Sequence, residues 1–341
     1  MKVIVSIVLV LGMLSFAQCS NQKSGKELGE FNRVDSISIQ DMNYPELLGI
    51  GLQVIKMDSL FIVNDFWGDS LLNIYNANTH KVERKLISKG NGPDEMSSPL
   101  DVKIIQDKIY VLSRPRFQFA YLLKDSIFTN NKMYGHTMLP QMSDCFLPLN
   151  DSVFVFSGMW EKRYALYQKG RADSLRFFGE YPDFWEKEKN FPTMAKAMFH
   201  QSQLAKHPSK NLFATSSRYA LDVYSYDPTG KKLPTLAFRK QLGNYYYQYT
   251  TGDITMVSES DDSDPQIKGI FCSDRYIYLL REVKGNENAS DILVIDWDGT
   301  PQRILKSNKR IDCLFVDENE HRGYCIVLDP ESKFCHFEIP E

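Results

Sequence analysis

The stretch LQVIKMDSLFIV, residues 52–63, decides the fold class of this chain. It places two apolar runs on either side of the polar pair Asp58-Ser59. Val, Ile, Leu and Phe favour strands, whereas Asp and Ser favour tight turns. The stretch therefore predicts a β-hairpin, and no long window of the chain shows the period of a helix.

The same strand-turn-strand pattern recurs along the chain. Its turns are centred at Asp58, Asp107, Asp151, Ser209, Asp274 and Asn319, with spacings of 49, 44, 58, 65 and 45 residues. Each spacing accommodates a four-stranded antiparallel blade, and the two longest leave room for insertions. A small sheet buries both faces only between neighbouring sheets. The repeats predict an all-β fold, a six-bladed β-propeller, with an insertion at 181–196 of one or two helical turns at most.

Closure of the ring needs an additional strand. The last repeat ends with FCHFEI, residues 334–339, and holds three strands. The alternating segment FNRVDSISI, residues 31–39, is expected to supply the fourth strand of that blade and to remove the open edges. The predicted domains are a signal peptide at 1–18, a lipid-anchored tether at 19–30 and the propeller at 31–341.

The N-terminus carries an export signal. Lys2 precedes an apolar run at 3–14 that is too short to span a bilayer. Cys19 follows this run and resembles the lipidation site of bacterial lipoproteins, although Gln18 replaces the small residue usual before it. The alternative is ordinary secretion, with Cys19 removed or left as a thiol. We expect a lipid-anchored protein of a Gram-negative cell envelope, periplasmic or surface-exposed, which touches the membrane only through the anchor.

The run KGNGPDE, residues 89–95, leads into PLDVK at 99–103. A G-x-G-P-x-E turn before the inner strand of the second blade resembles the TolB-like six-bladed propeller lipoproteins. The resemblance implies a secreted or periplasmic propeller and carries no catalytic residue with it. The two glycines also permit positive φ angles at the turn. A phosphate loop is excluded, because no Lys-Ser or Lys-Thr pair follows them.

The composition and motifs exclude several kinds of chemistry. The net charge of −3 leaves no basic excess for nucleic acid. The six histidines form no H-E-x-x-H or zinc spacing, and no G-x-S-x-G motif is present. We therefore predict no catalytic residue, no metal ligand and no cofactor.

Five cysteines lie outside the leader and the anchor, at positions 145, 272, 313, 325 and 335. Cys325 and Cys335 flank a turn at 329–332 and are expected to face each other across a hairpin. The separation allows a disulfide there but does not require one.

Arginines and aromatic residues recur at five positions, in the loops that follow the second strand of the first five predicted blades. Such loops converge at one mouth of a propeller channel, where they are able to hold an anionic or sugar-like ligand by bidentate hydrogen bonds and stacking. The predicted rim consists of Arg114, Arg116, Trp160, Arg218, Tyr219 and Arg281. The alternative is structural: each arginine pairs with a neighbouring carboxylate and each aromatic ring packs between blades.

These observations favour a monomeric binding or interaction propeller whose partner is an envelope protein, a peptide or a glycan. The run YYYQY at 245–249 is a stacking platform in that interpretation, or alternatively a strand packed between blades. A propeller hydrolase or lyase that acts on a sugar or lactone at the channel mouth is the rival function. Its only support is that this architecture hosts such chemistry in other proteins.

Overall fold

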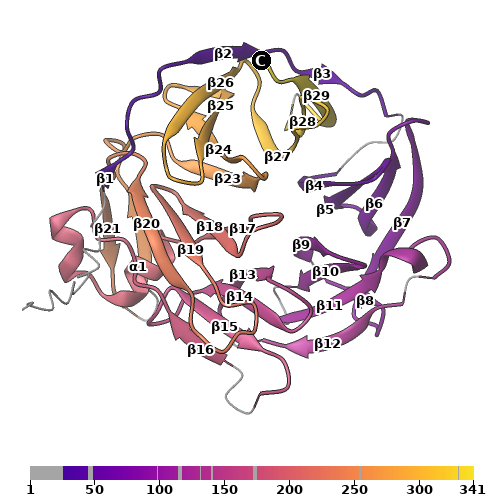
Figure 1. Cartoon of the computed structure of the whole chain (residues 1–341), viewed down its shortest axis with the longest axis horizontal. Coiled ribbons are helices and arrows are strands. Elements are labelled where there is room, and N and C mark those ends of the chain that lie inside the picture. Colours follow the sequence, from indigo (N-terminus) through magenta and orange to yellow (C-terminus); the bar gives the residue numbers. More distant parts are fainter. Residues whose placement is uncertain are drawn as a thin grey trace, which may run out of the picture.

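A computed structural model describes residues 26–44, 49–97, 99–113, 117–130, 132–139, 141–171, 175–252, 255–328 and 330–341. Six antiparallel sheets stand around a ring (Figure 1), so the predicted six-bladed propeller is confirmed. All six predicted turn centres lie between the first and second strands of a blade. At Asp58 the φ angle is +55°, a left-handed conformation that Asp tolerates better than most residues.

Blades 1 to 3 follow one another along the first half of the chain. Blade 1 also carries the short strand β8, which pairs with β7 in parallel. The strands are β4 (Gly51–Met57), β5 (Leu60–Asp65), β6 (Ser70–Asn76), β7 (Lys81–Lys89) and β8 (Glu95–Met96) in blade 1; β9 (Pro99–Ile105), β10 (Lys108–Ser113), β11 (Gln118–Leu123) and β12 (Tyr134–Met138) in blade 2; and β13 (Ser143–Pro148), β14 (Val153–Gly158), β15 (Tyr164–Gln168) and β16 (Leu175–Phe178) in blade 3. A 3-10 turn, η1 (Lys124–Ser126), follows β11.

Blades 4 to 6 complete the circle, and the two longest blade-to-blade connections hold the insertions. The strands are β17 (Gln203–Lys206), β18 (Leu212–Ser217), β19 (Ala220–Ser225) and β20 (Thr235–Gln241) in blade 4; β23 (Ile267–Cys272), β24 (Tyr276–Val283), β25 (Asn286–Asp296) and β26 (Pro301–Ser307) in blade 5; and β27 (Ile311–Asp317), β28 (Arg322–Leu328) and β29 (Ser332–Glu338) in blade 6. The first insertion contains η2 (Glu186–Asn190) and α1 (Thr193–Phe199), and the second contains the hairpin β21 (Tyr247–Thr250) and β22 (Met256–Glu259). A helical insertion was predicted at 181–196; it is present, but α1 runs to Phe199 and the two segments together are longer than the one or two turns predicted.

The core consists of six apolar layers, one between each pair of neighbouring blades. Between blades 6 and 1, for example, Phe61 and Val63 of β5 pack with Ile326 and Phe334. Both faces of each blade are therefore covered, which explains why the strands are apolar runs rather than strict alternations. Burial of these runs is the main force that holds the blades in a ring.

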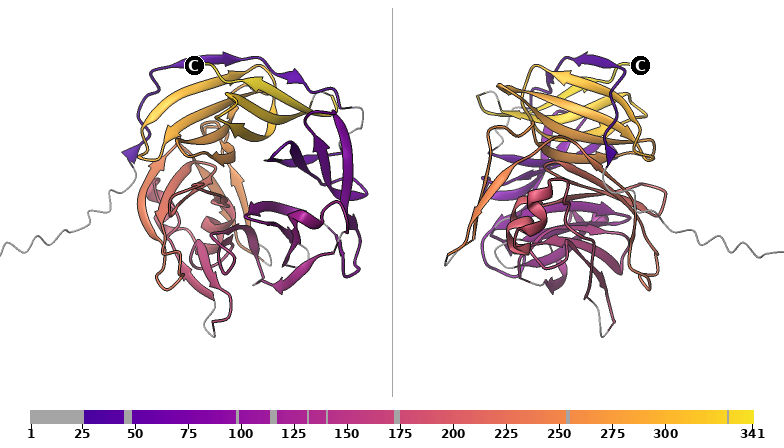
Figure 2. Two further views of the ribbon diagram at one scale, coloured as in Figure 1. Left: turned by 45° about the vertical axis from the view of Figure 1, so that its right-hand side comes forward. Right: turned by 90° about the vertical axis from the view of Figure 1, so that its left-hand side faces the viewer.

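The N-terminal chain closes the ring differently from the prediction. The expected latch, residues 31–39, contains β2 (Val34–Ile37), which pairs in parallel with β26 of blade 5. The fourth strand of blade 6 is instead β3 (Gln40–Asp41), which pairs antiparallel with β29. Further upstream, β1 (Lys26–Glu27) lies within the predicted tether and pairs in parallel with β20 of blade 4. The chain thus runs along the outside of three blades (Figures 1 and 2). An outer strand offers unpaired backbone groups to any extended segment nearby, so the available edges determined this pairing.

Cys325 and Cys335 lie directly opposite each other in the β28–β29 ladder, as predicted. Both are buried. Burial raises the pKa of the Cys325 thiol well above its usual range. This position therefore favours the neutral thiol and packing over nucleophilic chemistry.

Candidate functional site

The two ends of the ring differ in what the chain places there. In each antiparallel blade, the loop between the second and third strands leaves at the same end as the connection to the next blade. We call this the connection end, and it carries both insertions. The opposite end, here the turn end, carries the first and third turns of the blades. The predicted rim residues that the structure describes, Trp160, Arg218, Tyr219 and Arg281, belong to the connection end.

Arg218 and Tyr219 form the loop between β18 and β19. The Arg218 guanidinium forms an ion pair of 2.8 Å with Glu259 of β22, and the arginine side chain is 39% exposed. Tyr219 is buried, and its hydroxyl donates to Glu259 and, at 2.8 Å, to the carbonyl of Asp264. Glu259 holds both residues, so this loop is tied to the second insertion.

Trp160 and Arg281 are also paired within the protein. The Trp160 indole Nε1–H donates to the carbonyl of Gln141 at 3.0 Å, and its ring meets the edge of Phe177. Arg281 contacts Asp291 at 2.6 Å. Arg114 and Arg116 lie outside the described residues. Among the described residues no hydrogen bond or ion pair joins Trp160, Arg218 and Arg281 to one another. Their convergence on one ligand stays a prediction.

A buried charge cluster that the sequence does not predict lies beside this end. Asp222 of β19 accepts hydrogen bonds from Arg163 at 2.8 Å and from the Arg239 Nε and Nη2 atoms at 2.8 and 2.7 Å. Asp222 is fully buried. Burial raises the pKa of its carboxyl, but Arg239 and Arg163 outweigh that effect and hold the pKa below its usual value. Asp222 is therefore a carboxylate that links blade 3 to blade 4.

Glu188 joins the two insertions. It lies in the charge run EKEK, which is typical of a solvated surface, but it is completely buried. Its carboxylate accepts hydrogen bonds from the Tyr245 hydroxyl and, at 2.6 Å each, from His200 Nε2 and the Tyr247 hydroxyl. Burial raises the pKa of Glu188, but these bonds outweigh it and lower the pKa. The insertions are thereby locked to each other beside β20 (Figure 1).

The aromatic run at 245–249 is partly packed inside the protein and partly exposed, as a stacking surface would be. Tyr245 and Tyr247 are buried against Phe199 and Tyr219, whereas Tyr246 between them is exposed. This burial pattern is the alternation of extended chain, and the sequence does not show it, because residues 245–247 are all tyrosine. Most of the run is therefore packing, and one ring remains on the surface.

Exposed apolar side chains are concentrated at the connection end. Twelve large apolar residues are exposed among the described residues, and only Val34, Phe128 and Leu233 lie elsewhere. The other nine belong to loops, connections or strand ends at the connection end: Ile50, Trp67, Met138, Met142, Phe177, Met194, Tyr246, Met256 and Leu328. The sequence predicts charged residues at this end but not this apolar set, because the neighbours of a loop residue along the chain do not determine whether its side chain is exposed.

The architecture defines a six-bladed propeller with an elaborated connection end. The sequence matches the family described as TolB-like 6-blade propeller-like over residues 30–319. The chain belongs to this family, as the G-x-G-P-x-E turn suggested. No curated protein matches the sequence.

Solved structures share the fold at low sequence identity. A protein of Bacteroides fragilis described as exported is 9% identical, with a TM-score of 0.57 over 90% of this chain and 99% of that one. A member of the DUF4221 family from Bacteroides vulgatus is 10% identical, with a TM-score of 0.56 over 88% and 97%. The β-propeller domain of Cps50 (Swd1) from Myceliophteria thermophila is 9% identical, with a TM-score of 0.52 over 89% and 100%. At these identities the likeness concerns the fold alone.

Within the described ranges, none of the helices has the length and apolar character needed to span a bilayer.

Proposed function

We propose that this protein is a binding propeller of the cell envelope that engages a partner protein through its connection end. The observation that carries the proposal is the concentration of nine of the twelve exposed large apolar residues at that end. Exposed apolar side chains that form one patch are typical of interaction surfaces, and these nine belong to the same end of the ring.

The composition of the surface favours a protein over a small anionic ligand. The described rim arginines already pair with Glu259 and Asp291, so little unbalanced positive charge remains for an anion. Four of the exposed residues are methionines, whose flexible side chains adapt to an apolar partner surface. Trp67 is 61% exposed, and tryptophan is enriched among the residues that dominate interface energies.

The first test is a matched pair of photocrosslinks in cells that produce the full-length protein. A photoreactive residue at position 138, on the connection end, is expected to capture a discrete envelope protein, whereas one at position 233, on the turn end, is not. Both native residues are exposed, Met138 at 69% and Leu233 at 40%, so accessibility alone does not explain a difference. The same captured protein from both positions would refute the proposal.

Replacing Trp67 with alanine is expected to weaken binding of the captured partner by tenfold or more, roughly 1.4 kcal/mol or above. The measurement is a titration of purified partner with the purified mature protein. Leu233→Ala is the control, and we expect it to bind like the wild type. If Trp67→Ala binds as tightly as the control while both keep the wild-type melting temperature, the connection end is not the interface.

We propose in addition that Cys19 is lipidated, which places the propeller on a membrane of the envelope. The basis is the position of Cys19 after the apolar leader, and this residue lies outside the described ranges. Cys19→Ser is expected to move the protein from the membrane fraction to the soluble envelope fraction and to abolish incorporation of labelled palmitate. A wild-type protein that takes up no palmitate and fractionates like Cys19→Ser would instead indicate ordinary secretion.

A further inference from the structure

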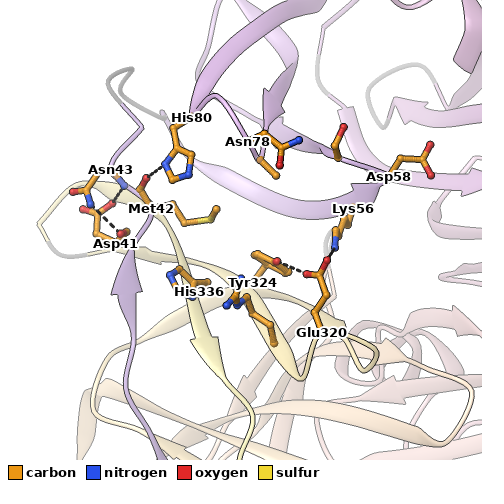
Figure 3. Close-up of a pocket in the computed structure, with 13 residues that line it drawn as sticks. Asp41, Met42, Asn43, Lys56, Asp58, Asn78, His80, Glu320, Tyr324 and His336 are labelled. Atoms are coloured by element: carbon orange, nitrogen blue, oxygen red, sulfur yellow. Dashed lines mark hydrogen bonds and ion pairs between the residues drawn. The ribbon is translucent and has the colours of Figure 1, made fainter.

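A cavity of about 430 Å³ lies at the turn end, between blades 6 and 1. Its walls come from the β4–β5, β6–β7 and β27–β28 turns and from the segment Asp41–Asn43, which begins at the last residue of the ring-closing strand β3 (Figure 3). The turns that line it leave the blades at the end of the ring opposite the connection end. Its chemistry is therefore independent of the interface proposed above.

The two cations in the wall are already neutralised. Lys56 contacts Asp317 at 2.8 Å and also pairs with Glu320. Glu320 in turn accepts the Tyr324 hydroxyl at 2.6 Å. The other cation, Arg322, pairs with Glu338 at 2.7 Å. An anionic ligand would have to displace these carboxylates, so the cavity is not built to select one.

Other side chains in the cavity keep polar atoms available. In Figure 3 neither the Asp58 carboxylate nor the Asn78 amide is joined to another labelled residue. His80 uses Nδ1 to contact the Met42 carbonyl at 2.9 Å, which leaves its Nε2. His336 lines the cavity as well, with its Nδ1 atom shielded from solvent. The cavity wall thus combines hydrogen-bond acceptors, an amide donor and two imidazole rings, which are able to donate or to accept hydrogen bonds.

We propose that this cavity binds a neutral saccharide, a mono- or disaccharide unit. Each sugar hydroxyl both donates and accepts hydrogen bonds. A sugar therefore matches a wall of amide, carboxylate and imidazole groups better than a ligand that only donates or only accepts. Met42 and Ala77 supply apolar wall for the C–H faces of a sugar ring. No group of three potential metal ligands occurs among the described residues, so the donor set does not point to a cation site.

Binding at this place couples to closure of the ring. The Met42 N–H donates to the Phe334 carbonyl of β29 at 3.0 Å, while the Met42 carbonyl contacts His80 of blade 1. The segment after β3 thus already connects blade 6 to blade 1. A sugar that contacts both blades binds the closed ring better than an opened one, so it raises the melting temperature by linkage.

The test is ligand-observed NMR and calorimetric titration of the purified mature protein with glucose, galactose, N-acetylglucosamine, maltose and cellobiose. Inorganic phosphate, calcium chloride and spermidine represent the competing ligand classes. We expect saturable binding of at least one sugar, a higher melting temperature in its presence, and no binding of the three ions. No binding of any sugar on the panel would overturn the proposal, as would binding of an ion that Asn78→Ala abolishes.

Two variants locate the site. Asn78→Ala is expected to lower sugar affinity at least tenfold, because it removes an unshared donor and acceptor from the wall. Asp58→Asn keeps a residue that tolerates positive φ, and we expect it to lower the affinity for the sugar several-fold. Its matched control is Asp107→Asn in the equivalent turn of blade 2, outside the cavity, which should bind like the wild type. Sugar affinity unchanged in both cavity variants would place the ligand elsewhere. Because these variants lie at the turn end, their result is independent of the Trp67 experiment.

Discussion

Replacing Asp222 with alanine is expected to lower the free energy of unfolding by about 3–5 kcal/mol, the usual effect of removing one partner from a buried ion pair. The carboxylate lies between Arg163 and Arg239, and the Arg163 and Asp222 side chains are almost completely excluded from solvent, at 1% and 0% exposure. Without it, the buried guanidinium group of Arg163 loses its ion-pair partner, and so does that of Arg239, whose side chain is 12% exposed. Denaturant unfolding of the purified domain measures the loss.

The pH dependence provides a second readout for the same residue. The pKa of Asp222 is lower in the folded protein than its ordinary value, because Arg239 and Arg163 outweigh the effect of burial. A carboxyl of this kind contributes stability above its unfolded pKa of about 3.9, and that contribution is lost as the pH falls through the folded pKa. The difference between wild type and Asp222→Ala is therefore expected to be constant above about pH 5 and to shrink below about pH 4.

The matched control is Asp312→Ala, which removes the carboxylate of a solvent-exposed pair. Arg310 and Asp312 are 3.0 Å apart, with side chains that are 54% and 27% exposed. Such pairs contribute about 0–1 kcal/mol. Equal losses for Asp222→Ala and Asp312→Ala would mean that the buried cluster does not hold blades 3 and 4 together.

Replacing Ile37 with alanine is expected to cost about 2–4 kcal/mol of unfolding free energy, because its side chain fills the layer between blades 5 and 6. Ile37 lies on β2, is 5% exposed and packs with Ile292, Leu305 and Phe337. The variant removes buried apolar atoms from the N-terminal chain while the blades themselves keep their sequence. Thermal and denaturant unfolding measure the effect.

Val34→Ala is the control on the same strand. Val34 pairs with Ile304 in the same parallel ladder, but its side chain is 54% exposed. We expect a change within about 0.5 kcal/mol. If both variants unfold like the wild type, the N-terminal chain does not stabilise the ring, and the pairing of β2 and β3 contributes nothing to the free energy of unfolding.

Local sequence was sufficient to predict the blades and the turns within them. Asp58-Ser59 and the apolar runs beside it specify a hairpin within a dozen residues, and the same holds at the other five turns. Repetition of the pattern then predicts a ring, because each sheet needs a neighbour on both faces. None of these steps requires knowledge of contacts between distant residues.

Charged residues show where local reasoning stops. Glu188 stands in an alternating charge run and resembles a solvated residue, but two insertions cover it. Asp222 meets Arg163 from 59 positions earlier in the chain, a pairing that no spacing predicts. The same limit applies to the rim. Arg281 was predicted in the loop after the second strand but lies within β24, and the partners of Arg218 and Arg281, Glu259 and Asp291, were not foreseen.

The sequence by itself determined the number of blades, the positions of their turns and the end of the ring to which each loop belongs, because hairpins form between residues close in the chain. Only the tertiary structure decided which edges the N-terminal chain pairs with, which carboxylates are buried and which loop side chains remain exposed. The physical reason is that burial and pairing of these groups depend on what packs against them from other blades. The alternating residues 31–39 suit any open edge equally well, and the assembled ring placed β2 on blade 5 and left only Gln40–Asp41 for blade 6.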